Sequence, residues 1–176
     1  ARSAHRSRGL QENQYRDGLL LALLSVWPIR RRSVTALTTE HIVATPEGFD
    51  IHLRAADTKE GRAESAPMPI ELVRYLSVYL RTVRPAMVRE SYHNGLWPSR
   101  KGGALGDARI YAIVRHAVMN EFGKKMGLHD FRRSAATFIA IDNPELIGLT
   151  AGILSHTDPR MTQEHYNLAN SGAASR

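Results

Sequence analysis

The segment "HIVATPEGFDIHLRA" (His41–Ala55) decides the fold class, because it places a β-hairpin inside a chain that is otherwise patterned for helices. Two β runs flank the turn signal Pro46-Glu47-Gly48, which predicts two antiparallel strands joined by a tight connection. The segment "ESAPMPI" (Glu64–Ile70) is expected to add a third strand, which its prolines confine to an edge of the sheet. The sequence therefore predicts a small three-stranded antiparallel sheet.

The regions on both sides of these strands have helical patterns. Leucine and alanine are dense enough in Asn13–Trp27 for a mostly buried helix, and Pro28 is expected to end it. Ser33 is expected to cap a short helix that runs through Leu37. Further helices are expected at Pro69–Arg84, Asp107–Phe122, His129–Ile141, Pro144–Leu154 and Pro159–Ala169. The predicted fold class is mainly α with a small antiparallel sheet, α+β.

The length of the chain indicates how many domains it forms, and its net charge indicates which class of partner it binds. The 176 residues suit one domain, with residues 1–12 as a flexible basic leader or linker and residues 13–176 as the folded part. Lys and Arg outnumber Asp and Glu by 24 to 17, and this net charge of +7 favours a polyanion as partner. The longest apolar run, Gly18–Trp27, is too short to span a bilayer, so no membrane association is expected.

The absence of cysteine excludes whole classes of chemistry. Without thiols there are no disulfides, no cysteine nucleophiles and no thiolate zinc sites. The histidines His129, His156 and His165 lack an acidic partner at ligand spacing, so no metal site is expected. No Walker loop and no acidic pair spaced for magnesium is present, and no cofactor is expected. The composition fits a cytoplasmic protein.

Four polar sites depart from the pattern around them. Each has an ordinary structural interpretation when taken alone: a solvated basic turn, an exposed lysine, a helix-capping histidine and a core tyrosine. H-x-x-R spacing at a helix start lets both side chains face the same way. The four sites are Arg30, Arg31 and Arg32 in "WPIRRR", Lys59 in the expected hairpin tip, His129 and Arg132 in "GLHDFRRSAATFIA", and His156 and Tyr166 in "LSHTDPRMTQEHYNL".

In this order along the chain, the four sites resemble the tyrosine recombinase family, the phage-integrase type of site-specific DNA recombinase. The resemblance covers about Tyr15 to Ala169 and implies that residues 13–176 are a catalytic domain without the family's N-terminal helical domain. The chain departs from the family where Pro28-Ile29-Arg30 replaces Gly-Leu-Arg and Ser33 replaces an acidic residue. Leu-Ser-His also stands in place of the commoner Leu-Gly-His.

The resemblance implies a metal-independent transesterification that forms a 3′-phosphotyrosyl enzyme and a free 5′ hydroxyl. Paired guanidiniums can grip the nonbridging phosphate oxygens and neutralise the charge that grows in the transition state. The implied roles are Arg30 and Arg132 as the phosphate clamp, Lys59 as proton donor to the leaving oxygen, His129 as general base, His156 as phosphate donor and Tyr166 as nucleophile. Arg31 or Arg32 are alternatives to Arg30, and Arg31, Arg32, Arg133 and His165 are expected to contact DNA.

Two alternatives stay open on the sequence alone. A type IB topoisomerase has a similar site but a lysine where His129 stands, and a DNA-binding module could keep the fold without activity. The expected partner is double-stranded DNA, with a homo-tetramer on paired sites and a monomer or weak oligomer in the absence of DNA. The polar segment Asn167–Arg176 motivates the latter expectation. The expected location is at the nucleoid.

Overall fold

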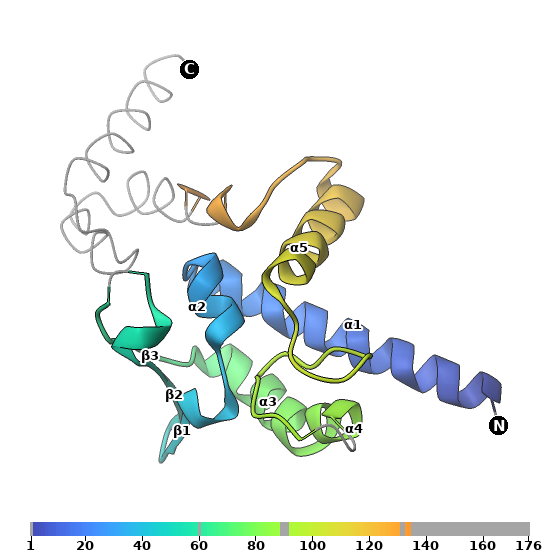
Figure 1. The fold of residues 1–176 in the computed structure, drawn as a ribbon, viewed down its shortest axis with the longest axis horizontal. Helices are drawn as coiled ribbons and strands as arrows, with labels where there is room; N and C mark the ends of the chain where they lie inside the picture. The colour runs from blue at the N-terminus through green and yellow to red at the C-terminus, as the bar shows by residue number, and fades with distance from the viewer. Residues whose placement is uncertain (1, 60, 89–91, 131–132, 135–176) are drawn as a thin grey trace.

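The structure is a computed structural model that describes residues 2–59, 61–88, 92–130 and 133–134. These residues form a mainly helical fold with one three-stranded antiparallel sheet, as the sequence predicts (Figure 1). Within these ranges, no helix combines the length and the apolar character needed to cross a membrane.

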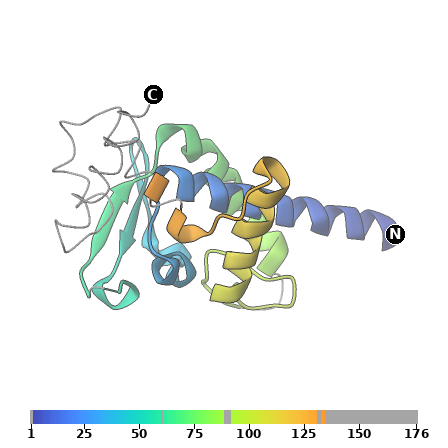
Figure 2. The same ribbon diagram turned by 90° about the horizontal axis from the view of Figure 1, so that it is seen from above.

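Helix α1 (Arg2–Val26) is the longest described element, and the helical segment after the sheet (Ile70–Val88) packs against it. Its buried face carries consecutive leucine pairs one turn apart, and the helix ends shortly before Pro28, as expected from a residue that lacks an amide proton. It begins at Arg2 and not at Asn13, so the segment expected to be a flexible leader is helical. The alanine, arginine and glutamine there favour helix. Figures 1 and 2 show this end of α1 projecting beyond the fold.

Helix α2 (Arg31–Ala36) follows at once, and the prediction that Ser33 caps it is wrong. Arg30 is the N-cap residue, in an extended conformation, and the Val34 N–H donates to its carbonyl at 3.0 Å. Ser33 lies inside the helix and is buried. The helix must begin early because Val34 and Leu37, both at most 1% exposed, have to reach the core.

The sheet contains β1 (Ile42–Thr45), β2 (Gly48–Leu53) and β3 (Glu64–Pro67) in the order β1-β2-β3. This confirms the hairpin and the position of the third strand at an edge. On β2 the buried residues are Ile51 and Leu53, which share one face because side chains alternate along a strand. Single 3₁₀ turns flank the hairpin: η1 (Thr39–His41) precedes β1 and η2 (Ala55–Asp57) follows β2.

A helical segment after the sheet combines α3 (Ile70–Val78), a π-helical stretch η3 (Tyr79–Val83) and α4 (Arg84–Val88). The predicted helix Pro69–Arg84 is therefore correct in position but is longer and irregular. In η3 the Arg84 N–H bonds to the carbonyl of Tyr79. Pro85 explains the wider turn, because proline donates no hydrogen bond and its ring would strike the carbonyl of the preceding turn.

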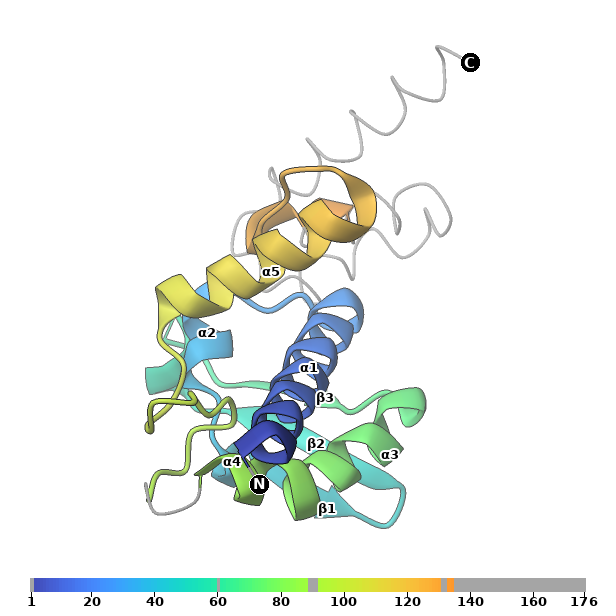
Figure 3. The same ribbon diagram turned by 90° about the vertical axis from the view of Figure 1, so that its right-hand side faces the viewer.

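Helix α5 has the predicted bounds, Asp107–Phe122. It ends at Gly123, whose φ of 62° is the left-handed conformation in which glycine commonly closes a helix. Figure 3 shows α5 crossing over α1, with α2 beside it. The buried residues of α5 lie on one helical face and are Ile110, Ile113, Val114 and Val118.

Aromatic side chains join these elements at the centre of the fold. Tyr79 is fully buried and donates from its hydroxyl to the Leu96 carbonyl at 2.7 Å. Its ring stacks on Tyr15 with centroids 6.4 Å apart and lies 5.9 Å from Trp97. Trp97 in turn donates from Nε1 to the Val34 carbonyl at 3.2 Å. Trp97, to which the sequence assigned no chemistry, therefore anchors the loop before α5 to α2.

Only the beginning of the predicted helix His129–Ile141 lies in the described part of the chain. Residues 128–130 and 133–134 are helical. The Asp130 carboxylate accepts from the Gly127 N–H at 2.7 Å, which is one half of a capping box. The predicted helices Pro144–Leu154 and Pro159–Ala169 lie outside the described residues.

Candidate active site and basic groove

Arg30 occupies the junction between α1 and α2, where the chain turns after Pro28. Pro28 and Ile29 are buried, so the backbone around Arg30 is held by the core. Arg30 itself is partly buried, whereas Arg31 and Arg32 are exposed. A guanidinium at a fixed and partly desolvated place suits recognition of a phosphate, because its interactions there are screened less by water.

Arg31 has a different neighbour. Its Nε lies 2.9 Å from Oδ2 of Asp107, the first residue of α5. Thr35 donates to the other carboxylate oxygen of Asp107 at 3.3 Å. The Arg31 side chain therefore points toward α5 and joins two helices. This contact distinguishes Arg31 from Arg30 among the three adjacent arginines.

Lys59 lies in the connection between β2 and β3, directly after η2 (Ala55–Asp57). Its side chain is exposed, while the preceding Thr58 is 3% exposed. Helix α2 packs against η2. The packing of these two elements places Arg30, at the N-cap of α2, and Lys59, just beyond η2, on adjoining parts of the fold.

A histidine that the sequence analysis did not single out contacts the base of the Lys59 loop. His41, at the end of η1 (Thr39–His41), is 2% exposed, and its Nε2 lies 3.2 Å from Oδ2 of Asp57. This is an ion-pair distance, although the contact falls outside hydrogen-bond geometry. Arg54 also donates to Asp57 Oδ2 at 2.8 Å. The hydrogen bond from Arg54 is the main reason that the pKa of Asp57 lies below its ordinary value.

His129 lies in the first turn of the helix that follows α5, with an exposed side chain, and Arg133 is exposed one turn later. In all three ribbon views the segment from Met126 to Asp130 lies on the same side of the fold as the α1–α2 junction. The remaining predicted site residues lie outside the described part of the chain; they are Arg132, His156, His165 and Tyr166.

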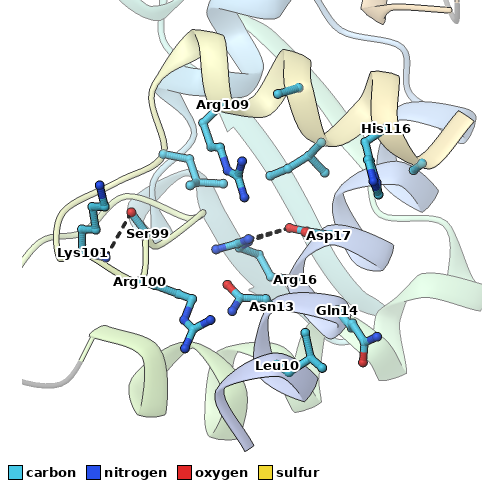
Figure 4. A pocket seen from close by; sticks show the side chains of 14 residues that line it. Leu10, Asn13, Gln14, Arg16, Asp17, Ser99, Arg100, Lys101, Arg109 and His116 are labelled. Atoms are coloured by element: carbon cyan, nitrogen blue, oxygen red, sulfur yellow. Dashed lines mark hydrogen bonds and ion pairs between the residues drawn. The ribbon is translucent and has the colours of Figure 1, made fainter. Parts of the chain in front are cut away.

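A groove of about 930 Å³ opens between α1, the loop before α5 and α5 itself (Figure 4). Arg109 contributes to it from α5, and Arg100 and Lys101 contribute from the loop. Asp17 is the acidic residue in its lining. The groove is therefore strongly basic, and it is separate from the loop that carries Lys59.

Arg16 forms part of the groove wall but has a structural role. Its side chain is 3% exposed and pairs with Asp17 at 2.7 Å. Its Nη1 also donates to the Pro98 carbonyl at 2.5 Å, which ties α1 to the loop before α5. Arg100, Lys101 and Arg109 are exposed, in contrast to Arg16. The sequence analysis did not single out these three cations. The segment "SRKGG" (Ser99–Gly103) was a signal for two of them, because a basic pair beside glycines is typical of an exposed loop.

Among the residues that the structure describes, no group of three histidine, aspartate or glutamate side chains could hold a metal ion. Arg30 and Lys59 each carry a cationic side chain on these adjoining parts of the fold. Such charge can stabilise a phosphoryl transition state directly.

Comparison with known proteins gives no matching family model. The chain is 25% identical over 162 residues to the tyrosine recombinase XerD of Staphylococcus epidermidis, an alignment that covers 92% of this chain and 53% of that protein. It is 24% identical over 160 residues to XerD of Staphylococcus aureus, covering 90% of this chain and 52% of that protein. The chain thus spans about half the length of these relatives.

Solved structures show the same fold. A XerH site-specific recombinase bound to difH substrate in a pre-cleavage complex superposes with a TM-score of 0.71 at 19% identity, over 88% of this chain and 44% of that chain. XerA recombinase gives a TM-score of 0.69 at 17% identity, over 94% of this chain and 61% of that chain. The chain therefore has sequence similarity to tyrosine recombinases along 92% of its length, and it shares the fold of XerH and XerA.

Proposed function

We propose that the chain is the catalytic part of a site-specific DNA recombinase that cuts and rejoins duplex DNA. The observation that carries this proposal is the alignment with XerD tyrosine recombinases over 92% of the chain, beside the ordered series of predicted site residues in the sequence. The packing of α2 against η2 supports it, because two members of that series, Arg30 and Lys59, come from these adjoining elements.

The first requirement of the reaction is to hold an anionic phosphodiester against an oxygen nucleophile. Arg30 and Arg132 are proposed to bind the two nonbridging oxygens, since a guanidinium is planar and stays protonated. His156 adds a further hydrogen bond to the same phosphate. Removal of one such donor commonly lowers the rate by about 10²–10³.

The second requirement is proton transfer at both ends of the reacting bond. The Tyr166 oxygen attacks phosphorus and forms the P–O bond to the enzyme, and its proton passes to His129. The P–O5′ bond breaks, and Lys59 donates a proton to the leaving 5′ oxygen. The bond energy stays in the 3′-phosphotyrosyl link, and a 5′ hydroxyl of the partner strand reverses the steps. No cofactor takes part in this scheme.

Binding of duplex DNA is proposed to extend beyond the reacting phosphate. The groove cations Arg100, Lys101 and Arg109 suit a phosphate backbone, because each neutralised phosphate releases counterions. The XerH structure supports DNA as the partner, since that recombinase is bound to difH substrate in it. Arg31, Arg32, Arg133 and His165 are further candidates for contact with DNA.

Recombination needs two sites held together, so we propose that a homo-tetramer assembles on paired DNA sites and that the chain is a monomer or weak oligomer without DNA. The proposed place of action is the cytoplasm, at the nucleoid. Light scattering of the protein with and without paired duplexes tests this assembly, and a stable tetramer without DNA would contradict it.

Covalent capture tests the proposed chemistry. The protein is incubated with a pool of randomised duplexes, each with a single nick, so that a short cleaved fragment diffuses away and traps the intermediate. Wild-type protein is expected to give an adduct that survives a denaturing gel, and Tyr166→Phe is expected to give none while binding DNA equally well. Sequencing of the captured duplexes identifies the preferred site.

Other results would favour the other functions. Relaxation of a supercoiled plasmid that lacks the captured sequence, at the rate found for a plasmid that contains it, would indicate a topoisomerase. The presence of His129, where type IB topoisomerases have a lysine, argues against that outcome. Binding without any adduct from either protein would indicate a DNA-binding module.

A further inference from the structure

The hydroxyl of Thr58 closes the loop that carries Lys59. Thr58 is 3% exposed, and its Oγ1 accepts from the Arg62 N–H at 3.1 Å. The same hydroxyl lies 2.8 Å from the Arg62 carbonyl and 3.1 Å from the Ala55 carbonyl, so its proton has two acceptors. One side chain therefore bonds to the main chain on both sides of Lys59, and only residues 59–61 lie between the bonded ends.

A second set of contacts fixes the main chain just before this loop. Asp57 is held by Arg54 at 2.8 Å and by His41 at 3.2 Å. The Thr38 N–H donates to Nδ1 of His41 at 3.1 Å, which orients the ring so that Nε2 faces Asp57. Through His41, the base of the loop is tied to η1 in addition to its own hairpin.

These contacts hold the main chain before and after Lys59. Gly61 adopts a φ of 65°, which turns the chain sharply before Arg62. With the main chain held at Thr58 and Arg62, the reach of the Lys59 ammonium group depends mainly on its own four-carbon stem. A proton donor needs this restriction, because catalysis falls steeply when the reacting atoms are displaced by about 1 Å.

We propose that Thr58 is a positioning residue for leaving-group protonation: its hydroxyl holds the Lys59 loop in the geometry from which the ammonium reaches the 5′ oxygen. This inference rests on the function proposed above, and Thr58 itself touches neither the DNA nor the reacting atoms. The His41–Asp57 contact supports the same loop from its other side.

The test compares two leaving groups on one DNA. The duplex recovered by covalent capture is resynthesised with either oxygen or sulfur at the 5′ bridging position of the cleaved bond. A thiolate, with a pKa of about 8.5 for its thiol, leaves without a proton donor, whereas an alkoxide needs one. A variant that only misplaces Lys59 is therefore slow on the oxygen duplex and normal on the sulfur duplex.

Thr58→Val removes the hydroxyl and keeps the branched shape. Its single-turnover cleavage of the oxygen duplex is expected to fall by about tenfold or more, with the factor of about 10²–10⁴ that a general acid contributes as the upper limit. Cleavage of the sulfur duplex is expected to match wild type, and Thr58→Ser is expected to restore the oxygen rate. Lys59→Ala is the reference variant, with a larger loss on oxygen and the same recovery on sulfur.

Ser65→Ala is the matched control. It deletes a hydroxyl from β3 of the same hairpin, where Ser65 Oγ lies 3.1 Å from Nδ1 of His52 and does not touch the loop. This variant is expected to cleave both duplexes at the wild-type rate. An equal loss for Thr58→Val on oxygen and sulfur, or no loss on oxygen, would overturn the positioning role.

Hydrogen exchange provides a readout that needs no DNA. The Arg62 amide donates to Thr58, so its exchange is expected to be faster in Thr58→Val and to return to the wild-type rate in Thr58→Ser. Unchanged exchange at Arg62 would overturn the proposal whatever the protein does to DNA. The two failures can be told apart. If exchange at Arg62 is faster in Thr58→Val but the wild-type protein never forms an adduct, the contact between Thr58 and Arg62 stands. The recombinase function is then overturned, and the role in protonation is overturned with it.

Discussion

Arg31 and Asp107 form an ion pair, with 2.9 Å between Nε and Oδ2, that joins the first turn of α2 to the first turn of α5. Both side chains are more than 40% exposed, so the pair contributes little to the free energy of folding. Its consequence is directional, because it turns the Arg31 side chain toward α5. This orientation disfavours Arg31 as an alternative to Arg30, which lies one residue earlier, is partly buried and is proposed to bind the reacting phosphate.

Arg30→Gln is expected to lower single-turnover cleavage of a captured duplex by about 10²–10³, because it removes one charged donor from the phosphate. Arg31→Gln breaks a surface ion pair and is expected to lower the rate by less than about tenfold. Covalent adduct formation with time measures both. A larger loss for Arg31→Gln than for Arg30→Gln would assign the phosphate contact to Arg31.

Asp57→Asn is expected to destabilise the protein in a pH-dependent manner. The hydrogen bond from Arg54 lowers the pKa of Asp57, so the folded state favours its ionised form. Its contribution is present above the ordinary carboxyl pKa of about 3.9 and is lost as the pH falls through the lowered value. Urea unfolding at pH 7 is expected to show a loss of roughly 1 kcal/mol or less, and the difference from wild type should shrink below about pH 4.

Glu47→Gln serves as the control for this pH dependence, since Glu47 is an exposed carboxylate in the turn between β1 and β2. Its unfolding midpoint is expected to follow wild type at every pH. A difference for Asp57→Asn that persists unchanged at pH 3 would show that the carboxylate charge is not the source of the stabilisation.

Substitution of the groove cations is expected to change the salt dependence of DNA binding. If Arg100 and Lys101 each neutralise one phosphate, replacing both by glutamine should reduce the slope of log K against log salt by about 1.8, at about 0.9 per contact on duplex DNA. Fluorescence anisotropy over a salt series measures this slope. Arg81→Gln, an exposed cation on η3 away from the groove, is expected to leave the slope unchanged.

Two glycine substitutions are expected to have opposite effects on stability. Gly48 has a φ of 149°, and an added Cβ would lie 2.8 Å from Cγ2 of Val73 on α3, so Gly48→Ala should destabilise by about 1–3 kcal/mol. Gly18 is on α1 with nothing within 4 Å of an added Cβ, so Gly18→Ala should stabilise by about 0.5–1 kcal/mol. Thermal unfolding measures both changes in stability. Effects of the same sign would contradict the different backbone environments described for Gly48 and Gly18.

The sequence predicted correctly those helices and strands whose ends carry turn-forming or helix-ending residues. The turn Pro46-Glu47-Gly48 separates β1 from β2, and Gly123 ends α5 at the expected residue. Where no such mark exists, the prediction was wrong. The helix before Pro28 starts at Arg2 because nothing upstream of Asn13 breaks it, and Ser33 does not cap α2 because burial of Val34 and Leu37 requires an earlier start.

By itself, the sequence determined the fold class, the resemblance to tyrosine recombinases and the order of the candidate residues along the chain, because these depend on residue type and spacing. Only the tertiary structure decided the contacts that join distant segments: Arg16 with Pro98, Arg31 with Asp107 and His41 with Asp57. Such contacts form when packing of the apolar core brings separate elements together, and no local pattern encodes which polar side chains then meet. The support for the Lys59 loop and the basic groove both arise in this way.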